Sequence, residues 1–452
     1  MKRFAVCGGV VALLVGLSAP AFATNGYQLI GTGQGAKAMA GAVTAAPVDT
    51  MTAITNPAGM ARVGERADFS MEAFMPVRAV DFTATGGARN TGGSELYGVP
   101  SVGWVAKAFN RDDMYFGGGM FATSGMGVDY DETTFAPAAA FGTSADITFS
   151  GHSAIQFWKM APTVAWHSSD DTSIGVSLNV DYQSITMTQK IRNLPFVAAP
   201  NERDINFYLG RPTAQMGVGA SVGVLHDVND TFTIGASYTT EQAFGNGEFR
   251  LATGDLQNYN GAVGAPGTYK LALNYPQQAA IGVAMRPNDR LLFDLDLKWI
   301  DWSSTHDKVD LKGPTNAFDI TGDNVGDVSD TQLEFGWDSQ IVYALGVQYA
   351  ANDALTLRGG FNYSKSPIGE EDVFNNMIFP AITEKHLTLG LDYKLGDHWG
   401  IGGTYMKAFK KEFTGNGDIS AAFQGATGFP PSSNAKITLE ETSLGLLLSY
   451  MF

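Results

Sequence analysis

Residues 173–183 read Ser-Ile-Gly-Val-Ser-Leu-Asn-Val-Asp-Tyr-Gln, with an apolar side chain at every second position from Ile174 to Tyr182. Small or polar side chains occupy the positions between them. Because successive side chains of a β-strand point to opposite faces, this period of two predicts a strand with one apolar face. In a soluble sandwich that face would be the core, whereas in a membrane barrel it would face lipid.

The same alternation recurs along the chain and predicts fourteen strands. Short polar turns such as Asp227-Val-Asn-Asp230 join the two strands of a pair, whereas roughly 15 to 30 residues separate successive pairs, as in an outer-membrane barrel. An even number of strands lets an antiparallel sheet close on itself. If one pair is miscounted, the number is twelve or sixteen. The expected strands are residues 67–80, 97–109, 114–126, 153–167, 172–187, 211–226, 231–245, 269–286, 290–303, 333–349, 354–364, 384–394, 398–411 and 435–452.

The first 23 residues have the form of a secretory leader. Lys2 and Arg3 precede an apolar stretch, residues 4–17, and Ala21-Phe-Ala23 is a small-x-small cleavage site. We therefore expect the mature chain to begin at Thr24. The only cysteine, Cys7, lies in this leader, so we expect no disulfide, zinc cluster or thiol nucleophile in the mature chain.

The last strand also carries a targeting pattern. The chain ends on Phe452, and Leu444, Leu446, Leu448 and Tyr450 recur before it at period two. This ending resembles the terminal strand that the outer-membrane assembly machinery recognises. Together with the leader, it predicts a barrel in the outer membrane of a Gram-negative bacterium, with lipid, lipopolysaccharide and that machinery as partners.

The composition argues against several other functions. The formal net charge is -16, which is unfavourable for nucleic-acid binding. We interpret the acidic balance as solubility of extracellular loops, and the alternative is that these loops hold divalent cations. The six histidines are scattered, and no Ser-His-acid arrangement can be assembled from neighbouring strands. We therefore expect no catalytic residues, no metal site, no cofactor and no enzymatic activity.

Residues 24–66 do not read as strands. They are rich in glycine and alanine, and they are too many for a tail and too few for a domain. We expect a small plug inside the barrel. The alternative is a disordered periplasmic tail, which would expose Met39, Ile54 and Met60. The expected organisation is therefore a leader at 1–23, a plug at 24–66 and an all-β transmembrane barrel at 67–452.

Within this plug, Asn56-Pro57-Ala58 follows the expected mature start Thr24-Asn-Gly-Tyr27 and the glycine- and alanine-rich segment 33–41. Together they resemble the hatch of the outer-membrane long-chain fatty acid transporter family. Further stretches agree with this family in order and spacing over essentially the whole mature chain. These stretches are 161–166, 275–284, 299–304, 337–346 and 366–386.

The resemblance implies a monomeric fourteen-stranded barrel that is closed by the hatch and carries hydrophobic molecules inward. In this family the ligand is first caught in an apolar groove between extracellular loops. It then reaches a pocket beside the hatch and leaves sideways near a kink in the third strand. Some members carry fatty acids, and others carry aromatic hydrocarbons.

Two long connections are unusually apolar for surface loops, and exposed apolar patches need a reason. We expect them to form a ligand groove, because concave apolar surface is the usual form of a small-molecule site. The alternative is that these side chains pack against each other as a loop core. The groove residues are Phe135, Phe141, Phe149, Leu194, Phe196 and Val197.

The third predicted strand is rich in glycine, at Gly117, Gly118, Gly119 and Gly125. Glycine inside a strand indicates a bulge, a bend or a close backbone approach. We interpret the cluster as a defect in the wall through which an apolar ligand leaves. The alternative is that these glycines make room for the plug.

Three cations are candidates for contact with a polar head group, namely Arg192, Lys298 and Arg358. A desolvated ion pair with a carboxylate would orient such a ligand. The alternative is that lumenal charges pair with one another and fix the plug. Where fatty acid carriers have a basic residue after Trp337, this chain has Asp338, which leaves neutral hydrocarbons open.

The sequence therefore predicts passive uptake of hydrophobic molecules across the outer membrane. A structural or adhesive surface barrel and a porin for polar solutes are the alternatives. The sequence does not identify the solute.

Overall fold

The computed structural model describes residues 24–93, 96–108, 111–197, 202–259, 261–314 and 330–452. The expected leader, with Cys7, lies outside the described residues. Among the helices of the described residues, none is both long and apolar enough to cross a membrane.

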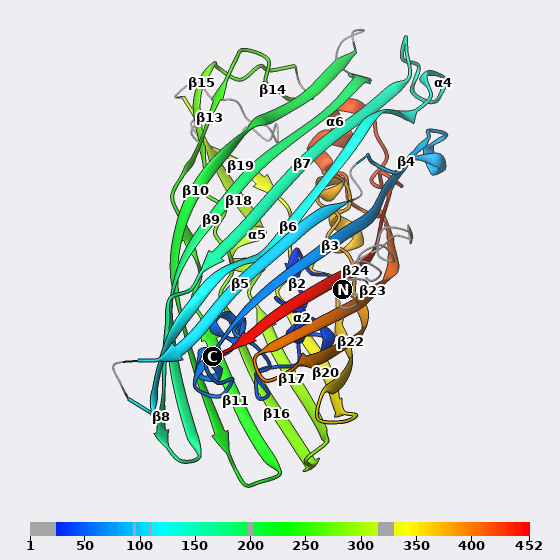
Figure 1. Ribbon diagram of the computed structural model, residues 1–452. Coiled ribbons are helices and arrows are strands. Elements are labelled where there is room, and N and C mark those ends of the chain that lie inside the picture. The colour runs from blue at the N-terminus through cyan, green and yellow to red at the C-terminus, as the bar shows by residue number, and fades with distance from the viewer. Residues whose placement is uncertain (1–23, 94–95, 109–110, 198–201, 260, 315–329) are drawn as a thin grey trace, which may run out of the picture.

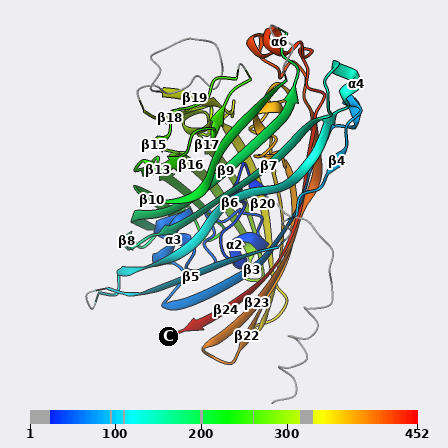
Figure 2. The same cartoon turned by 90° about the horizontal axis from the view of Figure 1, so that it is seen from above.

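The described chain forms a closed antiparallel barrel of fourteen wall strands (Figures 1 and 2). The last strand pairs with the first, from Met451 opposite Arg66 to Lys436 opposite Asp81, so the sheet closes on itself. The predicted all-β barrel and its fourteen strands are thereby confirmed. One wall strand has two segments, β7 and β8. The wall strands are β3 (Arg66–Asp81), β5 (Tyr97–Lys107), β6 (Met114–Ala136), β7 (Ile147–Met160) with β8 (Thr163–Ser169), β9 (Thr172–Leu194), β10 (Arg203–Asp227), β11 (Phe232–Thr239), β16 (Gln278–Asn288), β17 (Leu291–Ile300), β20 (Gln340–Ala350), β21 (Leu355–Ser364), β22 (Lys385–Leu395), β23 (Trp399–Thr414) and β24 (Lys436–Met451).

In the lower part of the wall, apolar side chains face outward. On β9, Val176 and Leu178 are 43% and 55% exposed, whereas Ser177 between them and Asn179 after them are fully buried. A water-soluble protein would bury the apolar set, so this arrangement fits lipid outside and a polar interior. The deciding stretch of the sequence thus lies in the membrane-facing part of β9.

Above residue 183 the alternation of β9 reverses. Ile185, Met187 and Ile191 are buried, and Lys190 points outward. This reversal is expected where a strand leaves the bilayer, because its outer face then meets water and its inner face can pack against an apolar core. The predicted ends at 126, 153, 187 and 211 are therefore wrong, because β6, β7, β9 and β10 continue far into the expected loops.

The end of the barrel with long connections, here called the loop end, carries further structure. A four-stranded sheet consists of β13 (Gly247–Leu251), β15 (Gly267–Leu271), β18 (Lys308–Lys312) and β19 (Asp330–Glu334). The predicted strands 269–286 and 333–349 are wrong at their starts, because 267–271 and 330–334 join this sheet instead of the wall. The predicted strand 231–245 ends early, at Thr239. Shorter elements are η2 (Thr83–Thr85), β4 (Arg89–Asn90), α4 (Ala138–Phe141), β12 (Ala243–Phe244), β14 (Leu256–Gln257), α5 (Ser303–His306), η3 (Glu370–Asp372), η4 (Phe374–Asn376) and α6 (Ala421–Thr427).

Residues 24–65, here called the N-terminal segment, lie inside the barrel, where Figure 1 shows them in dark blue. Polar side chains of the wall bind their backbone. A carboxylate oxygen of Asp296 accepts from Val43 N at 3.0 Å and Thr44 N at 2.9 Å, and Ser177 Oγ donates to Ala53 O at 2.8 Å. The elements of this segment are β1 (Thr24–Asn25), β2 (Gln28–Leu29), α2 (Gln34–Ala38), α3 (Thr52–Thr55) and η1 (Pro57–Ala61).

Glycine pairs on neighbouring strands make room for this segment. They are Gly175 with Gly223, Gly235 with Gly282, and Gly346 with Gly360. A Cβ on Gly223 would lie 2.0 Å from Asn56 Oδ1, and one on Gly360 would lie 2.6 Å from the Met39 carbonyl carbon. The wall therefore lacks side chains where the backbone of the segment touches it.

An aromatic cluster joins the N-terminal segment to the loop end. Tyr27, Tyr275, Trp302, His306 and Trp337 form it, with ring centroids 4.8 to 5.9 Å apart. The Tyr27 hydroxyl lies 3.0 Å from His306 Nε2. Burial lowers the pKa of His306 to about 3.

Replacing Gly360 with valine should loosen the N-terminal segment, because overpacking a filled site costs about 1–3 kcal/mol. We expect faster hydrogen exchange in residues 24–65, while heat-modifiable mobility on gels reports a folded barrel. Gly359→Val is the matched control, because a Cβ there meets its nearest atoms at an ordinary 3.6 Å. Equal effects of the two variants would contradict this packing.

The aromatic cluster should weaken in acid. His306 binds a proton in the unfolded chain near pH 6.5 but stays neutral when folded down to pH 3, so stability falls as the pH drops between these values. The contribution is about 1.4 kcal/mol per pH unit. Tryptophan fluorescence of the wild type and His306→Phe, followed from pH 7 to 4, should differ in slope. His152→Gln, at a half-exposed histidine, should keep the wild-type slope.

Candidate functional site

The pairing of β5 with β6 stops partway along the wall. It runs from Lys107 opposite Tyr115 to Ser101 opposite Phe121. Beyond this point β6 pairs with the N-terminal segment, where Ser124 lies opposite Gln28 and Gly125 N donates to Tyr27 O at 3.1 Å. Residues 97–100 of β5 pair with β3. Strand β6 thus leaves its wall neighbour and turns towards the lumen.

Local backbone chemistry explains this turn. Gly118 has a φ of 134°, and a Cβ there would lie 2.2 Å from Ala161 O. Ala161-Pro162 interrupts the neighbouring strand between β7 and β8, because proline has no N–H to donate. The β6–β7 register then shifts between Ala122 and Ser124.

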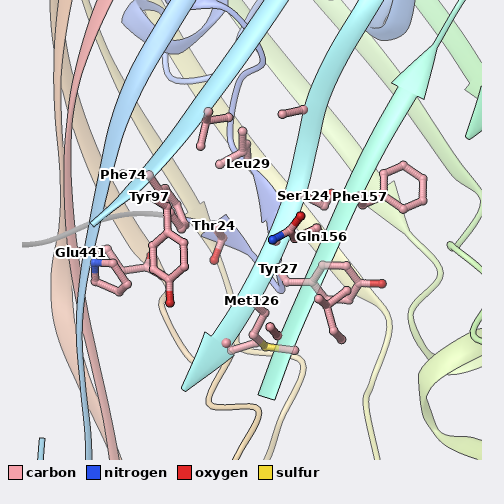
Figure 3. A pocket seen from close by; sticks show the side chains of 18 of the residues that line it. Thr24, Tyr27, Leu29, Phe74, Tyr97, Ser124, Met126, Gln156, Phe157 and Glu441 are labelled. Carbon is pink, nitrogen blue, oxygen red and sulfur yellow. The ribbon is translucent and has the colours of Figure 1, made fainter. Parts of the chain in front are cut away.

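A cavity of about 370 Å³, here called the lateral cavity, lies where β5 and β6 part (Figure 3). Its volume suits one small apolar molecule. It reaches from Tyr27 on the N-terminal segment to Leu96 before β5, which is 68% exposed. Further apolar lining comes from Phe74, Val99, Met126, Ile155, Phe157 and Leu439.

Few polar groups reach this cavity, and most of them have partners. Arg78 donates to Gly127 O and, at 3.2 Å, to the Tyr97 hydroxyl. Glu441 Oε2 accepts from Thr383 Oγ1 at 3.1 Å. In Figure 3 the rings of Phe74, Tyr97 and Tyr27 and the thioether of Met126 surround the space between them. Such a site offers shape and apolar contact rather than a reactive constellation.

The strand-three glycines lie at this turn. A Cβ on Gly117 would come 2.1 Å from Trp104 O, and one on Gly119 would come 2.0 Å from Val102 O, so both are held by close backbone contact. Gly125 lines the lateral cavity and binds the N-terminal segment through its N–H. These glycines thus lie at the break in the wall, and Gly125 also contacts the N-terminal segment, so neither interpretation of the glycine cluster excludes the other.

The residues Asn56, Pro57 and Ala58 lie against β9 and β10. Asn56 Nδ2 donates to Thr44 O at 2.7 Å and to Val224 O at 3.1 Å, and its Oδ1 accepts from Ala58 N at 3.2 Å. A Cβ on Gly175 would lie 2.3 Å from the Pro57 carbonyl carbon. Asn56 therefore ties two parts of the N-terminal segment to the wall.

The predicted groove residues gather at the loop end, mostly as packed core. Phe135 and Phe149 are buried around Phe82, with centroids 4.6 and 5.5 Å from its ring, and Leu194 is buried as well. Phe141 stacks on Phe429 at 4.6 Å. Phe196 is half-buried beside Arg203, and Val197 is 69% exposed.

The three predicted cations are separate, and none lines the lateral cavity. Arg192 is half-exposed, 3.4 Å from Glu132. Lys298 Nζ donates to Gln28 Oε1 at 3.3 Å beside a smaller cavity of about 70 Å³, and Arg358 pairs with Asp392. Sequence reasoning missed Tyr27, Leu96, Tyr97 and Glu441 as lining residues. No local pattern marks them, because the turn of β6 brings them together.

Comparison with known proteins agrees with this architecture. Residues 11–445 match the family model described as "Outer membrane protein transport protein (OMPP1/FadL/TodX)". A search of curated protein sequences gives no match.

Solved structures with the same fold include a FadL homologue of Pseudomonas aeruginosa, which is 17% identical with a TM-score of 0.71 over 94% of this chain and 100% of that one. The toluene transporter TodX of Pseudomonas putida is 18% identical, with a TM-score of 0.68 over 95% and 100%. The toluene transporter TbuX of Ralstonia pickettii is 19% identical, with a TM-score of 0.65 over 93% and 98%.

The match of the family model over most of the chain shows the family. The chain belongs to the OMPP1/FadL/TodX family of outer membrane transport proteins, and it is a transport barrel of the Gram-negative outer membrane rather than an enzyme.

Proposed function

We propose that this protein takes up neutral hydrophobic small molecules and releases them sideways through the lateral cavity. The observation that carries the proposal is the end of β5–β6 pairing at Ser101 and Phe121, with an apolar cavity of about 370 Å³ at the break. An apolar molecule gains by leaving water for such a cavity, and it gains again by leaving the cavity for lipid.

The lining supports a neutral cargo. Arg192, Lys298 and Arg358, the candidates for holding a carboxylate, lie elsewhere and have partners in the protein. Among the described residues of the lining, the one cationic side chain is that of Arg78, which donates to Gly127 and Tyr97 and shares the cavity with the acidic Glu441. Two of the structural relatives are toluene transporters. Aromatic and aliphatic hydrocarbons are therefore preferred over fatty acids.

Capture would begin at the loop end. Phe141 and Val197 are the accessible part of the proposed groove, and Phe135, Phe149, Leu194 and Phe196 lie behind or beside them. The charged sugars of lipopolysaccharide exclude oily molecules, so apolar side chains held outside the bilayer give them a first binding surface. Because the inner rings are packed, the cargo must separate them on its way inward.

Residues 24–66 would act as a hatch that blocks the passage of water and ions while forming one wall of the lateral cavity. Residues 1–23 would be removed as a leader, and residues 67–452 would form the barrel. A monomer suffices for this route, because the described cavity is built from one chain. The filled lumen also disfavours a porin for polar solutes. Lipopolysaccharide and the barrel assembly machinery remain proposed partners.

Filling the lateral cavity should block uptake. Ala122 lines it, so Ala122→Trp should reduce uptake of labelled toluene or dodecane by cells to the level of cells that lack the protein. Val102→Trp on β5 is the matched control, because Val102 is exposed on the outer face and should tolerate the same side chain. Full uptake by folded Ala122→Trp would exclude this route.

Loosening the hatch should raise leakage. Asn56→Ala leaves the Thr44 and Val224 carbonyl oxygens without this donor, a loss of about 1–3 kcal/mol. We expect higher ion conductance in planar bilayers and slower hydrocarbon uptake. Asn352→Ala is the control. It removes a turn side chain that accepts from Ala354 N and Leu355 N but does not touch the proposed hatch, so conductance should not change.

Cargo class can be read from competition. Cells with and without the protein would receive labelled toluene together with excess alkane, aromatic or fatty acid. Competition by neutral compounds alone supports the proposal, whereas competition by fatty acids alone would assign a carboxylate ligand. No difference between the two cell types for any compound would favour a structural barrel.

A further inference from the structure

The carboxylate of Glu441 is buried beside the start of the mature chain. Glu441 projects inward from β24, is 3% exposed, and lines the lateral cavity together with Thr24. The backbone of Thr24 lies beside this carboxylate. Thr383 Oγ1 lies 3.1 Å from both Glu441 Oε2 and Thr24 O, so one hydroxyl links the two residues.

Glu441 lacks a cationic partner at ion-pair distance within the described part of the chain. Arg78 and Lys37 attract it from beyond ion-pair distance, and Lys37 is engaged by Glu72. Burying a carboxylate without a counter-ion is strongly unfavourable. The site therefore calls for a positive charge close to Thr24 N.

We propose that Glu441 is the counter-ion of the mature N-terminus, and that leader cleavage creates the ion pair that seats residues 24–29. Hydrolysis of the Ala23–Thr24 peptide bond adds water, leaving a carboxylate on Ala23 and an amino group on Thr24. The usual pKa of a terminal amine is about 8, so this amine is an ammonium at neutral pH. It would take the place of the Thr24 amide N–H, beside Glu441.

The ion pair would affect transport by holding residues 24–29 in place. Residues 24–29 include Tyr27, which belongs to the aromatic cluster, and Leu29, which lines the lateral cavity. Asn25 Oδ1 accepts from Ser364 Oγ at 3.2 Å, but this neutral contact lies on the other side of the strand from the cavity. The ammonium therefore fixes the end of the hatch that forms the cavity wall, and Glu441 is a positioning residue.

The inference rests on the leader cleavage proposed above, and N-terminal sequencing of the purified outer-membrane protein tests that step separately. A start at Thr24 is expected. A start at any other residue would overturn the ion pair without touching the proposed transport route.

The decisive experiment combines Glu441→Gln with one glycine inserted between Ala23 and Thr24. The insertion moves the ammonium about 3.6 Å away but keeps an amide N–H on Thr24 as a donor. With the natural start, Glu441→Gln should speed hydrogen exchange of residues 25–29 by at least about a hundredfold, because breaking a buried pair strands one charge. With the inserted glycine, the same substitution should change the exchange rate less than about threefold.

Two further measurements complete the test. Glu440→Gln is the matched control, because Glu440 pairs with Lys407 on the outer face of the same strand, and it should leave the exchange of residues 25–29 unchanged in both chains. Affinity for naphthalene, followed by its fluorescence, should fall in parallel with protection. The proposal is overturned if Glu441→Gln reduces the protection of residues 25–29 equally with and without the inserted glycine, while gel mobility shows a folded barrel. Glu441 would then act only as a neutral hydrogen-bond acceptor.

Discussion

The structure depends on satisfying backbone polar groups inside a tube that is surrounded by lipid. A regular wall does this through its strand pairing, but an irregular segment needs partners from elsewhere. The wall supplies them on its lumenal face. Asp296 accepts from two N–H groups and Ser177 donates to a carbonyl oxygen, and the paired glycines let the two backbones approach. In return, Asn56 of the segment donates to a carbonyl oxygen of the wall. The lumen is thus shaped around residues 24–65 and could not simply be filled by another sequence.

The same constraint governs the break in the wall. If β6 only left β5, its N–H and C=O groups would be stranded within the barrel. It instead exchanges one partner for another, pairing with β2 through Ser124 and Gly125. The lateral cavity is therefore a stable feature, because the N-terminal segment supplies the hydrogen bonds that the missing neighbour would have made. The N-terminal segment and the break in the wall are parts of one arrangement.

Strand number and facing were predictable because alternation reports directly which medium a side chain meets. Val176 and Leu178 face outward as expected. The strand ends were not predictable in the same way. Ile185 and Met187 continue the strand but face inward, so a rule that places apolar side chains outside ends the strand too early. The sequence also did not reveal that residues 267–271 form a strand separate from β16, because alternation does not show which sheet a strand joins.

Parts of the site were predictable only where the type of a single residue indicates its backbone conformation or forms a known motif. Gly118 has a conformation that side chains disfavour, and Asn56-Pro57-Ala58 is a recognisable motif. Tyr27, Leu96 and Glu441 come together from three distant parts of the chain, and their grouping depends on how far β6 bends. The groove phenylalanines were found as a set, but their burial around Phe82 depends on packing that a sequence does not reveal.

The reversal of alternation along the wall also indicates at which height along the barrel the lateral cavity lies. On β7, Trp158 lies opposite Tyr182 and Gln156 lies opposite Ser184, so the outer surface changes from aromatic to polar between these two rungs. Both Trp158 and Gln156 border the lateral cavity. The lateral cavity consequently lies where the outer surface of the wall changes from aromatic to polar, which is the pattern expected at the border between acyl chains and head groups. On the proposed route, a molecule leaving there would have passed the sugar layer, and diffusion within the membrane would complete its transfer.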